Sequence, residues 1–123
     1  MRLTGRVEKG WGHEFIFESN DLYCGKLLCF HKPGAKCSMH FHLQKDETWH
    51  VISGAFVVRW IEPADGTPCS KVLETHDTWR NLPGYPHQLE ALEANSMIVE
   101  VSTPDSVSDN YRVSPGDSQN ATS

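Results

Sequence analysis

The chain has 123 residues, a formal net charge of −5 at pH 7, and 38% hydrophobic and 10% aromatic residues. This length and composition predict one soluble globular domain that builds a core without disulfides or a structural metal. The acidic balance and the absence of a Lys/Arg run argue against a nucleic-acid partner. No apolar run approaches the roughly 18 residues of a bilayer span, so no membrane partner is expected.

The N-terminal end and the cysteines indicate the compartment. Residues 1–6 lack the apolar stretch of a signal peptide, which makes a cytoplasmic location the expectation. The cysteines have no C-x-x-C spacing and are expected to be reduced and partly buried. They are Cys24, Cys29, Cys37 and Cys69. Strand alternation places Cys37 on the face opposite His40, so we do not count it as a metal ligand.

Short β-branched and aromatic runs separated by turn residues dominate the chain. A turn followed by a strand is expected within residues 7–18, and further strands at 23–31, 36–42, 47–53, 55–61, 71–75, 78–82, 87–92 and 97–103. With no helical period, this pattern predicts an all-β sandwich or barrel. From Pro104 the composition shifts to Ser, Asp, Asn, Gly and Pro, and we predict a domain over 1–113 and a disordered tail over 114–123.

The stretch from Gly34 to Gly54 carries the strongest chemical signal. His40 and His42 are two residues apart and would share one face of a strand. Turn-compatible residues 44–46 follow, so a tight hairpin would bring Glu47 beside the two histidines on the neighbouring strand. Imidazoles and a carboxylate that converge in this way make a metal site, and His87 is available as a fourth ligand.

The spacing of these residues resembles the two sequence motifs of the cupin superfamily. The first motif is matched by Gly34, His40, His42, Glu47 and Gly54, and the second by Pro83–His87 with Gly84 and His87 at its defining positions. The resemblance implies a single jelly-roll β-barrel with His40, His42, Glu47 and His87 as metal ligands. This ligand set suits Mn, Fe, Co, Ni or Zn and leaves about two coordination positions open.

Four further segments are similar to the small cupins of the mannose-6-phosphate isomerase-like group. They are Trp11–Glu14, Tyr23–Leu27, Lys45–Thr48 and Ile98–Pro104, within a similarity that covers roughly residues 7–112. The similarity implies aldose–ketose isomerisation of a sugar phosphate. The chain departs from the related bifunctional enzymes at His40, where those carry Gln, and at Gln88, where they carry an Arg that is a bidentate partner for phosphate.

Several other residues are candidates for the substrate site. A sugar phosphate needs a cationic anchor, for which Lys26 and Arg59 are candidates unless they face solvent. Glu100 lies in an apolar strand and is a candidate acid–base catalyst together with Lys26, or else a structural partner of Lys26 or Arg59. The remaining candidates for substrate contact are Tyr85, Trp49 and Gln88, and the aromatic pair can equally be core.

Three functions therefore stay open. The first is a metal-dependent sugar-phosphate isomerase or epimerase, which predicts a cation near the metal. The second is an Fe(II) dioxygenase, which predicts an apolar pocket. The third is a non-catalytic module that binds a sugar or anion through the metal. The family resemblance also implies a homodimer, with the outer face of strands such as 55–61 as one possible interface.

Overall fold

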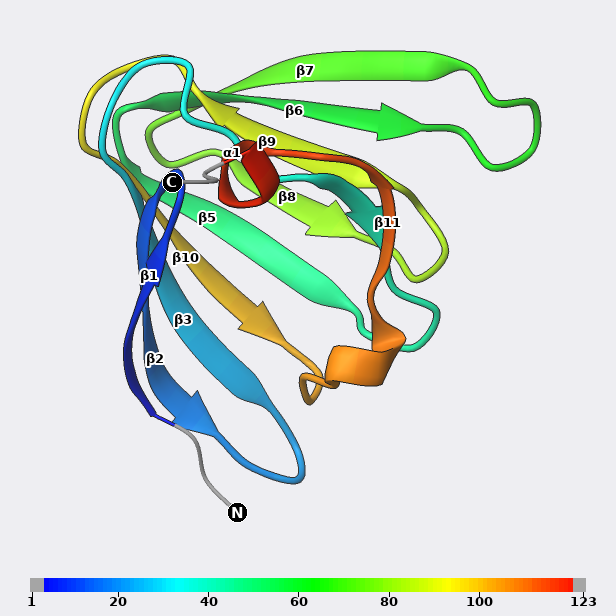
Figure 1. Cartoon of the computed structure of the whole chain (residues 1–123), viewed down its shortest axis with the longest axis horizontal. Helices are drawn as coiled ribbons and strands as arrows, with labels where there is room; N and C mark the ends of the chain where they lie inside the picture. Colours follow the sequence, from blue (N-terminus) through cyan, green and yellow to red (C-terminus); the bar gives the residue numbers. More distant parts are fainter. Residues whose placement is uncertain (1–3, 121–123) are drawn as a thin grey trace.

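The computed structural model describes residues 4–120, and these fold into two antiparallel sheets (Figure 1). The six-stranded sheet has the order β1-β2-β3-β10-β5-β8, and the five-stranded sheet has the order β11-β4-β9-β6-β7. The predicted all-β jelly-roll architecture is confirmed. The strands of the first sheet are β1 (Gly5–Lys9), β2 (Gly12–Ser19), β3 (Cys24–Phe30), β10 (Ser96–Ser102), β5 (Glu47–Ser53) and β8 (Thr78–Asn81). Those of the second are β11 (Tyr111–Ser114), β4 (Met39–Phe41), β9 (His87–Ala91), β6 (Ala55–Ile61) and β7 (Pro68–Glu74).

Side-chain alternation along β10 explains how one sheet carries both a core and a charged site. Ile98 and Glu100 point inward and are buried, whereas Val101 points to the outer face of the sheet and is exposed. Ile98 lies opposite Leu28 of β3 and belongs to the apolar core. Two residues further on, Glu100 lies opposite Lys26. The inner face of the sheet therefore changes from apolar to charged within one strand.

The core fills the apolar end of the sandwich. The indole of Trp11 stacks on Phe30 with ring centroids 4.3 Å apart, and Phe30 meets Phe56 of the opposite sheet edge-on at 5.3 Å. These aromatic contacts join the two sheets and leave the other end of the interior to polar residues. The remaining buried members of this cluster are Leu28, Ala35, Trp49, Val51, Val58, Leu73, Leu89, Ala91 and Ile98.

The predicted hairpin over residues 36–53 is wrong. β4 pairs with β9 and β11, whereas β5 pairs with β10 and β8, so the two segments belong to different sheets. The backbone N–H groups of residues 43–45 are held by the side chain of Asp109 rather than by a paired strand. Residues 42–46 thus form a corner between the sheets, and Glu47 approaches the histidines from across the interior.

The C-terminal segment departs most from the pattern expected from composition. Residues 104–114, which we call the strap, contain the short 3-10 helix η1 (Val107–Asp109) and β11 and run along one side of both sheets (Figure 1). Residues 114–120, assigned to a disordered tail, include the end of β11 and the helix α1 (Asp117–Asn120). Asp117 is hydrogen-bonded to the backbone of Lys36 in both directions, at 2.9 Å each. Residues 121–123 of that tail lie outside the described residues. No helix within residues 4–120 is long and apolar enough to cross a membrane.

Candidate metal centre and its cavity

A cavity of about 350 Å³ lies between the two sheets at their polar end. Its walls come from β2, β3, β5 and β10 on one side, from β4 and β9 on the other, and from the strap. Three histidines gather in this region. His40 lies on β4, His42 directly follows that strand, and His87 begins β9 opposite His40.

The three imidazoles form one cluster. Each offers a ring nitrogen, and these atoms all lie within 4.8 Å of one another, an arrangement that could hold a metal ion. The rings of His40 and His87 have centroids 4.7 Å apart, and those of His40 and His42 5.2 Å. The histidine part of the predicted ligand set is therefore assembled in the structure.

Hydrogen bonds to the backbone fix which nitrogen each ring presents. The Nδ1 atom lies 2.9 Å from the Ser38 carbonyl in His40, 2.7 Å from the Asp109 carbonyl in His42, and 2.9 Å from the Tyr85 carbonyl in His87. Because a carbonyl only accepts, each Nδ1 carries the proton and each Nε2 keeps its lone pair. Metal-binding histidines are oriented by this same kind of second hydrogen bond.

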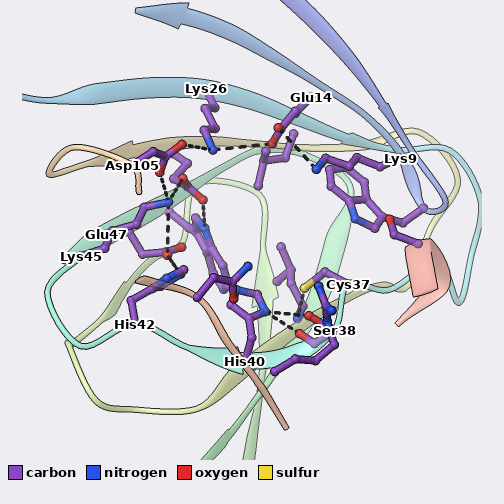
Figure 2. Close-up of a pocket in the computed structure, with 18 of the residues that line it drawn as sticks. Lys9, Glu14, Lys26, Cys37, Ser38, His40, His42, Lys45, Glu47 and Asp105 are labelled. Carbon is purple, nitrogen blue, oxygen red and sulfur yellow. Dashed lines mark hydrogen bonds and ion pairs between the residues drawn. The ribbon is translucent and has the colours of Figure 1, made fainter. Parts of the chain in front are cut away.

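Glu47 faces the same point from the opposite sheet. Its Oε1 atom lies 3.4 Å from Nε2 of His42 and 3.7 Å from Nε2 of His87 (Figure 2 shows the Glu47 carboxylate beside His42). Its second oxygen accepts a hydrogen bond from Asn81 Nδ2 at 3.4 Å, and Trp79 Nε1 donates to Asn81 Oδ1 at 2.9 Å. Two side chains outside the cavity therefore set the orientation of this carboxylate.

A cation fits the centre of this cluster. Within residues 4–120, His87 Nε2 is the one buried side-chain nitrogen or oxygen without a hydrogen-bond partner. The atom it faces, Glu47 Oε1, is also an acceptor. Acceptors buried face to face are unfavourable unless a proton or a cation lies between them. Imidazole and carboxylate ligands suit divalent transition metals, and the residues present thus fit the metal that the sequence predicts.

The electrostatics of the cluster favour the ligating forms. Burial lowers the pKa of His40 to about 3, so this ring is neutral at physiological pH. Burial alone would raise the pKa of Glu47, but its contacts with His42 and His87 hold it well below the usual value. For His42, the hydrogen bond with Glu47 outweighs burial and raises the pKa. A bound metal would compete with a proton for Nε2 of this ring.

The other end of the cavity carries a connected set of charges. The Lys45 ammonium lies 3.2 Å from Glu100 and 2.6 Å from Asp105, and Lys26 lies 2.6 Å from the second oxygen of Asp105. Figure 2 shows that this series of ion pairs continues from Lys26 to Glu14, 3.8 Å away, and from Glu14 to Lys9. Burial favours the neutral forms of both lysines, but the surrounding carboxylates outweigh it and raise the pKa of each. Lys26 and Lys45 are therefore buried cations.

Glu100 is connected to the metal cluster through Lys45. Its Oε1 accepts a hydrogen bond from Trp49 Nε1 at 3.0 Å, and its Oε2 pairs with Lys45. Lys45 also lies 3.9 Å from Glu47. Burial, and then the charge of Glu47, raise the pKa of Glu100 above the usual range for a glutamate. A carboxyl with a raised pKa beside a metal site is suited to proton transfer.

The strap completes the site, and nothing in its residue types indicates this role. Asp109 supplies the carbonyl that orients His42 and the carboxylate that holds the corner after it. Asp105 bridges the two buried lysines although its own side chain is 36% exposed. Aspartates are ordinary residues of polar loops, so nothing distinguishes these two from their neighbours before the chain is folded.

The other predicted site residues are divided by the fold. Trp49, Lys26 and Glu100 line the cavity. Arg59 does not, because it lies in β6 and pairs with Glu90 at 2.8 Å. Tyr85 lines a separate small cleft with Trp60 and Trp79. Gln88 is buried behind the cavity wall, where its Nε2 donates to the Cys37 carbonyl at 3.0 Å.

Two expectations about residues near the motifs have different outcomes. Cys37 was expected to face away from His40, yet both line the cavity, because residues 37 and 38 precede β4 and do not follow its alternation. Burial raises the pKa of the Cys37 thiol to about 12, so it stays protonated. The histidines outside the motifs include a mutual pair, His13 and His31, with nitrogens 2.8 Å apart, and His50, which pairs with Thr78 at 2.8 Å.

Comparison with known proteins identifies the fold. No family model matches the chain, and no curated protein matches its sequence significantly. Solved structures do match. CapF from Staphylococcus aureus superimposes with a TM-score of 0.76 at 21% identity, over 93% of this chain and 34% of CapF. Oxalate decarboxylase from Bacillus subtilis gives 0.75 at 21%, over 92% and 32%. KdgF from Halomonas sp. gives 0.66 at 22%, over 78% and 81%. The chain has the cupin fold.

The chain spans about a third of the length of CapF and of oxalate decarboxylase. At these identities the likeness is one of fold. It confirms the architecture inferred from the two cupin motifs. The metal and the substrate therefore have to be inferred from the residues that line the cavity of this chain.

The protein should bind one metal ion per chain through the cluster. We expect stoichiometric Mn, Fe, Co, Ni or Zn after reconstitution and desalting, and its loss in His40→Ala or His87→Ala, because each removes a ligand. Asn81→Ala should weaken binding roughly 10- to 100-fold by releasing Glu47. Inductively coupled plasma mass spectrometry measures the content. His50→Ala, which alters a histidine bonded to Thr78, is the control and should bind normally; equal metal content in all variants would contradict the assignment.

The Asp105 bridge should make stability depend on pH. Burial alone would raise the pKa of Asp105, but Lys45 and Lys26 lower it from 3.8 to about 2. This carboxylate therefore stabilises the fold above about pH 4, and the contribution disappears as the pH falls towards 2. Asp105→Asn should cost roughly 1 to 2 kcal/mol at pH 7, allowing for solvent screening.

Urea unfolding at several pH values measures this difference. The gap between wild type and Asp105→Asn should close between about pH 4 and pH 2. Asp21→Asn, in the exposed β2–β3 loop, is the matched control and should change stability by less than about 0.5 kcal/mol. A gap for Asp105→Asn that stays constant with pH would show that the carboxylate charge is not what stabilises the bridge.

Proposed function

We propose that this cupin is a metal-dependent isomerase or epimerase that acts on mannose-6-phosphate or a related sugar phosphate. The observation that carries the proposal is the Glu100 carboxylate. It is buried, held by Lys45 and Trp49, and lies in the same cavity as the histidine–glutamate cluster. A proton-transfer group placed beside a metal site is what aldose–ketose isomerisation requires.

The cavity wall also favours a polar substrate. Lys26, Lys45, Glu14, Glu100 and Asp105 line it, whereas a dioxygenase of the alternative kind would need an apolar pocket. Hydroxyl groups of a sugar can exchange hydrogen bonds with such a wall. One structure of the same fold, CapF, is a capsular polysaccharide assembling protein, which is consistent with a carbohydrate ligand here.

The chemistry would be divided between the metal and this chain's own residues. When bound, the metal would supply a Lewis acid that holds and polarises neighbouring sugar oxygens. His40, His42, Glu47 and His87 would hold it. Glu100 would remove the proton from C2 of the open-chain aldose and return it to C1, while a proton moves from the C2 hydroxyl to O1. The C2–H bond breaks, a C1–H bond forms, and no oxidant or reductant is consumed.

Lys45 and Trp49 would act as positioning residues for this step. Each donates to a different oxygen of Glu100, which fixes the plane of the carboxylate against the cavity. Lys45 also balances the charges of Glu47 and Asp105. The homodimer implied by the sequence resemblance stays a prediction, and sedimentation velocity of the purified chain measures it.

Glu100→Gln tests the catalytic assignment. The variant keeps the size and the hydrogen-bond acceptor but cannot take a proton, so kcat should fall about 10²- to 10⁴-fold. Metal content should stay unchanged, because Glu100 is not among the predicted ligands. Conversion of mannose-6-phosphate to its ketose is followed with the metal-loaded protein.

The control for this experiment is Glu90→Gln. Glu90 is a half-buried glutamate paired with Arg59 outside the cavity, and its loss should leave kcat within about two-fold. Normal turnover by Glu100→Gln would contradict its role. Binding of the sugar by the wild type without any turnover would identify the chain as the non-catalytic sugar-binding module instead.

A further inference from the structure

The cationic side chains that line the cavity differ in whether they are paired with carboxylates of the protein. They are Lys9, Lys26, Lys45 and Arg112. The two buried lysines share Asp105 and contact further carboxylates, and Lys9 lies 3.7 Å from Glu14. The Arg112 side chain makes no ion pair or hydrogen bond with any residue of the described range 4–120. It is also exposed, so a ligand can reach it.

The position of Arg112 relates it directly to the metal cluster. β11 pairs with β4 so that Arg112 lies opposite His40. Residues directly opposite in an antiparallel pair project from the same face of the sheet. His40 and Arg112 accordingly both line the cavity. A ligand held at the histidine cluster would have its solvent-side end near this arginine.

The backbone that carries Arg112 is well supported. The preceding Tyr111 stacks on Phe41 of β4, with ring centroids 5.1 Å apart and planes inclined by 16°. Asp109, three residues before Arg112 in the strap, accepts hydrogen bonds from the His42 ring and from the backbone of Leu43. The side chain therefore projects from a fixed strand, which lowers the entropy cost of holding a ligand.

The chemistry of this end of the cavity matches an oxyanion. A guanidinium group presents paired N–H donors that fit phosphate in a bidentate manner, and it keeps its charge at any physiological pH. Ser106 and Asn110, two neutral residues with hydrogen-bonding side chains, line the cavity on the same strap. The position expected to carry an arginine after the second motif holds Gln88, which instead bonds to the Cys37 carbonyl.

We propose that Arg112 is the anion anchor of this cupin and binds the terminal phosphate of a sugar phosphate whose other end lies at the histidine cluster. The ligand class, a sugar phosphate, rests on the proposed function, whereas the role of Arg112 in binding is tested separately from turnover. Arg112 would decide between phosphorylated and unphosphorylated ligands and would take no part in proton transfer.

Isothermal titration calorimetry on the full chain reconstituted with Mn²⁺ tests the anchor directly. The probes are mannose-6-phosphate and mannose. Arg112→Gln should weaken binding of mannose-6-phosphate roughly 10- to 100-fold, as expected for the loss of charged hydrogen bonds, and leave mannose binding within about two-fold. Arg112→Lys keeps the charge without the paired donors, so its affinity for mannose-6-phosphate should lie between those of the wild type and Arg112→Gln.

Arg6→Gln is the matched control. Arg6 is an exposed arginine on β1 whose side chain pairs with Glu8 and does not line the cavity, so both affinities should stay unchanged. Equal affinity of wild type and Arg112→Gln for mannose-6-phosphate would overturn the anchor, as would a wild type that does not bind this ligand. Phosphate-dependent binding through Arg112 without turnover would support the anchor while the isomerase assignment fails. Turnover with the same kcat and KM in wild type and Arg112→Gln would support the isomerase assignment and overturn the anchor.

Discussion

Four acceptor atoms meet in the interior of this protein, and the arrangement of the polar end depends on them. The ring nitrogens of His40, His42 and His87 lie within 4.8 Å of one another, and the Oε1 atom of Glu47, from the other sheet, lies 3.4 Å from Nε2 of His42 and 3.7 Å from Nε2 of His87. Backbone carbonyls hold the Nδ1 protons on the far side of each ring. Such a cluster is costly to bury without a cation, which is why its geometry indicates a metal more strongly than the residue types alone.

The strap connects this cluster to the charged half of the cavity. Asp109 orients His42, Asp105 bridges Lys26 and Lys45, and Arg112 lies opposite His40. Three contacts of the site thus come from a segment of eight residues, 105–112, which includes η1 and the start of β11. Its backbone is fixed by pairing with β4 and by the corner after that strand, so changes in the strap should affect the metal ligands and the substrate cavity together.

The sequence predicted the parts of the site that follow from short-range spacing. The His-x-His pair, Glu47 and His87 could be selected because their spacing matches a motif, and Glu100 because strand alternation placed it inside an apolar strand. The hairpin between the histidines and Glu47 was wrong, since spacing along the chain does not show that residues 42–46 pass from one sheet to the other. Which glutamate, lysine or arginine shares the cavity depends on contacts between residues far apart in the chain, such as Lys26 and Asp105, which are 79 positions apart.

The positions of the lysine and arginine side chains relative to the cavity were the hardest feature to predict from the sequence. Lys26 and Arg59 had equal claims as anchors from the sequence, because alternation along a strand does not say which face is buried or who the neighbours are. In the structure Lys26 is neutralised within the cavity and Arg59 pairs with Glu90 outside it. Nothing in the sequence distinguishes Arg112, since it follows a segment rich in Ser, Asp, Asn, Gly and Pro.

The central claim, that His40, His42, Glu47 and His87 together hold one metal ion, is tested most directly by anomalous diffraction. Crystals of the chain reconstituted with Mn²⁺ would be measured on both sides of the metal absorption edge. The account predicts a single anomalous peak about 2.0 to 2.3 Å from the three Nε2 atoms and a Glu47 oxygen. A peak elsewhere, or none at this cluster in a fully loaded protein, would contradict it.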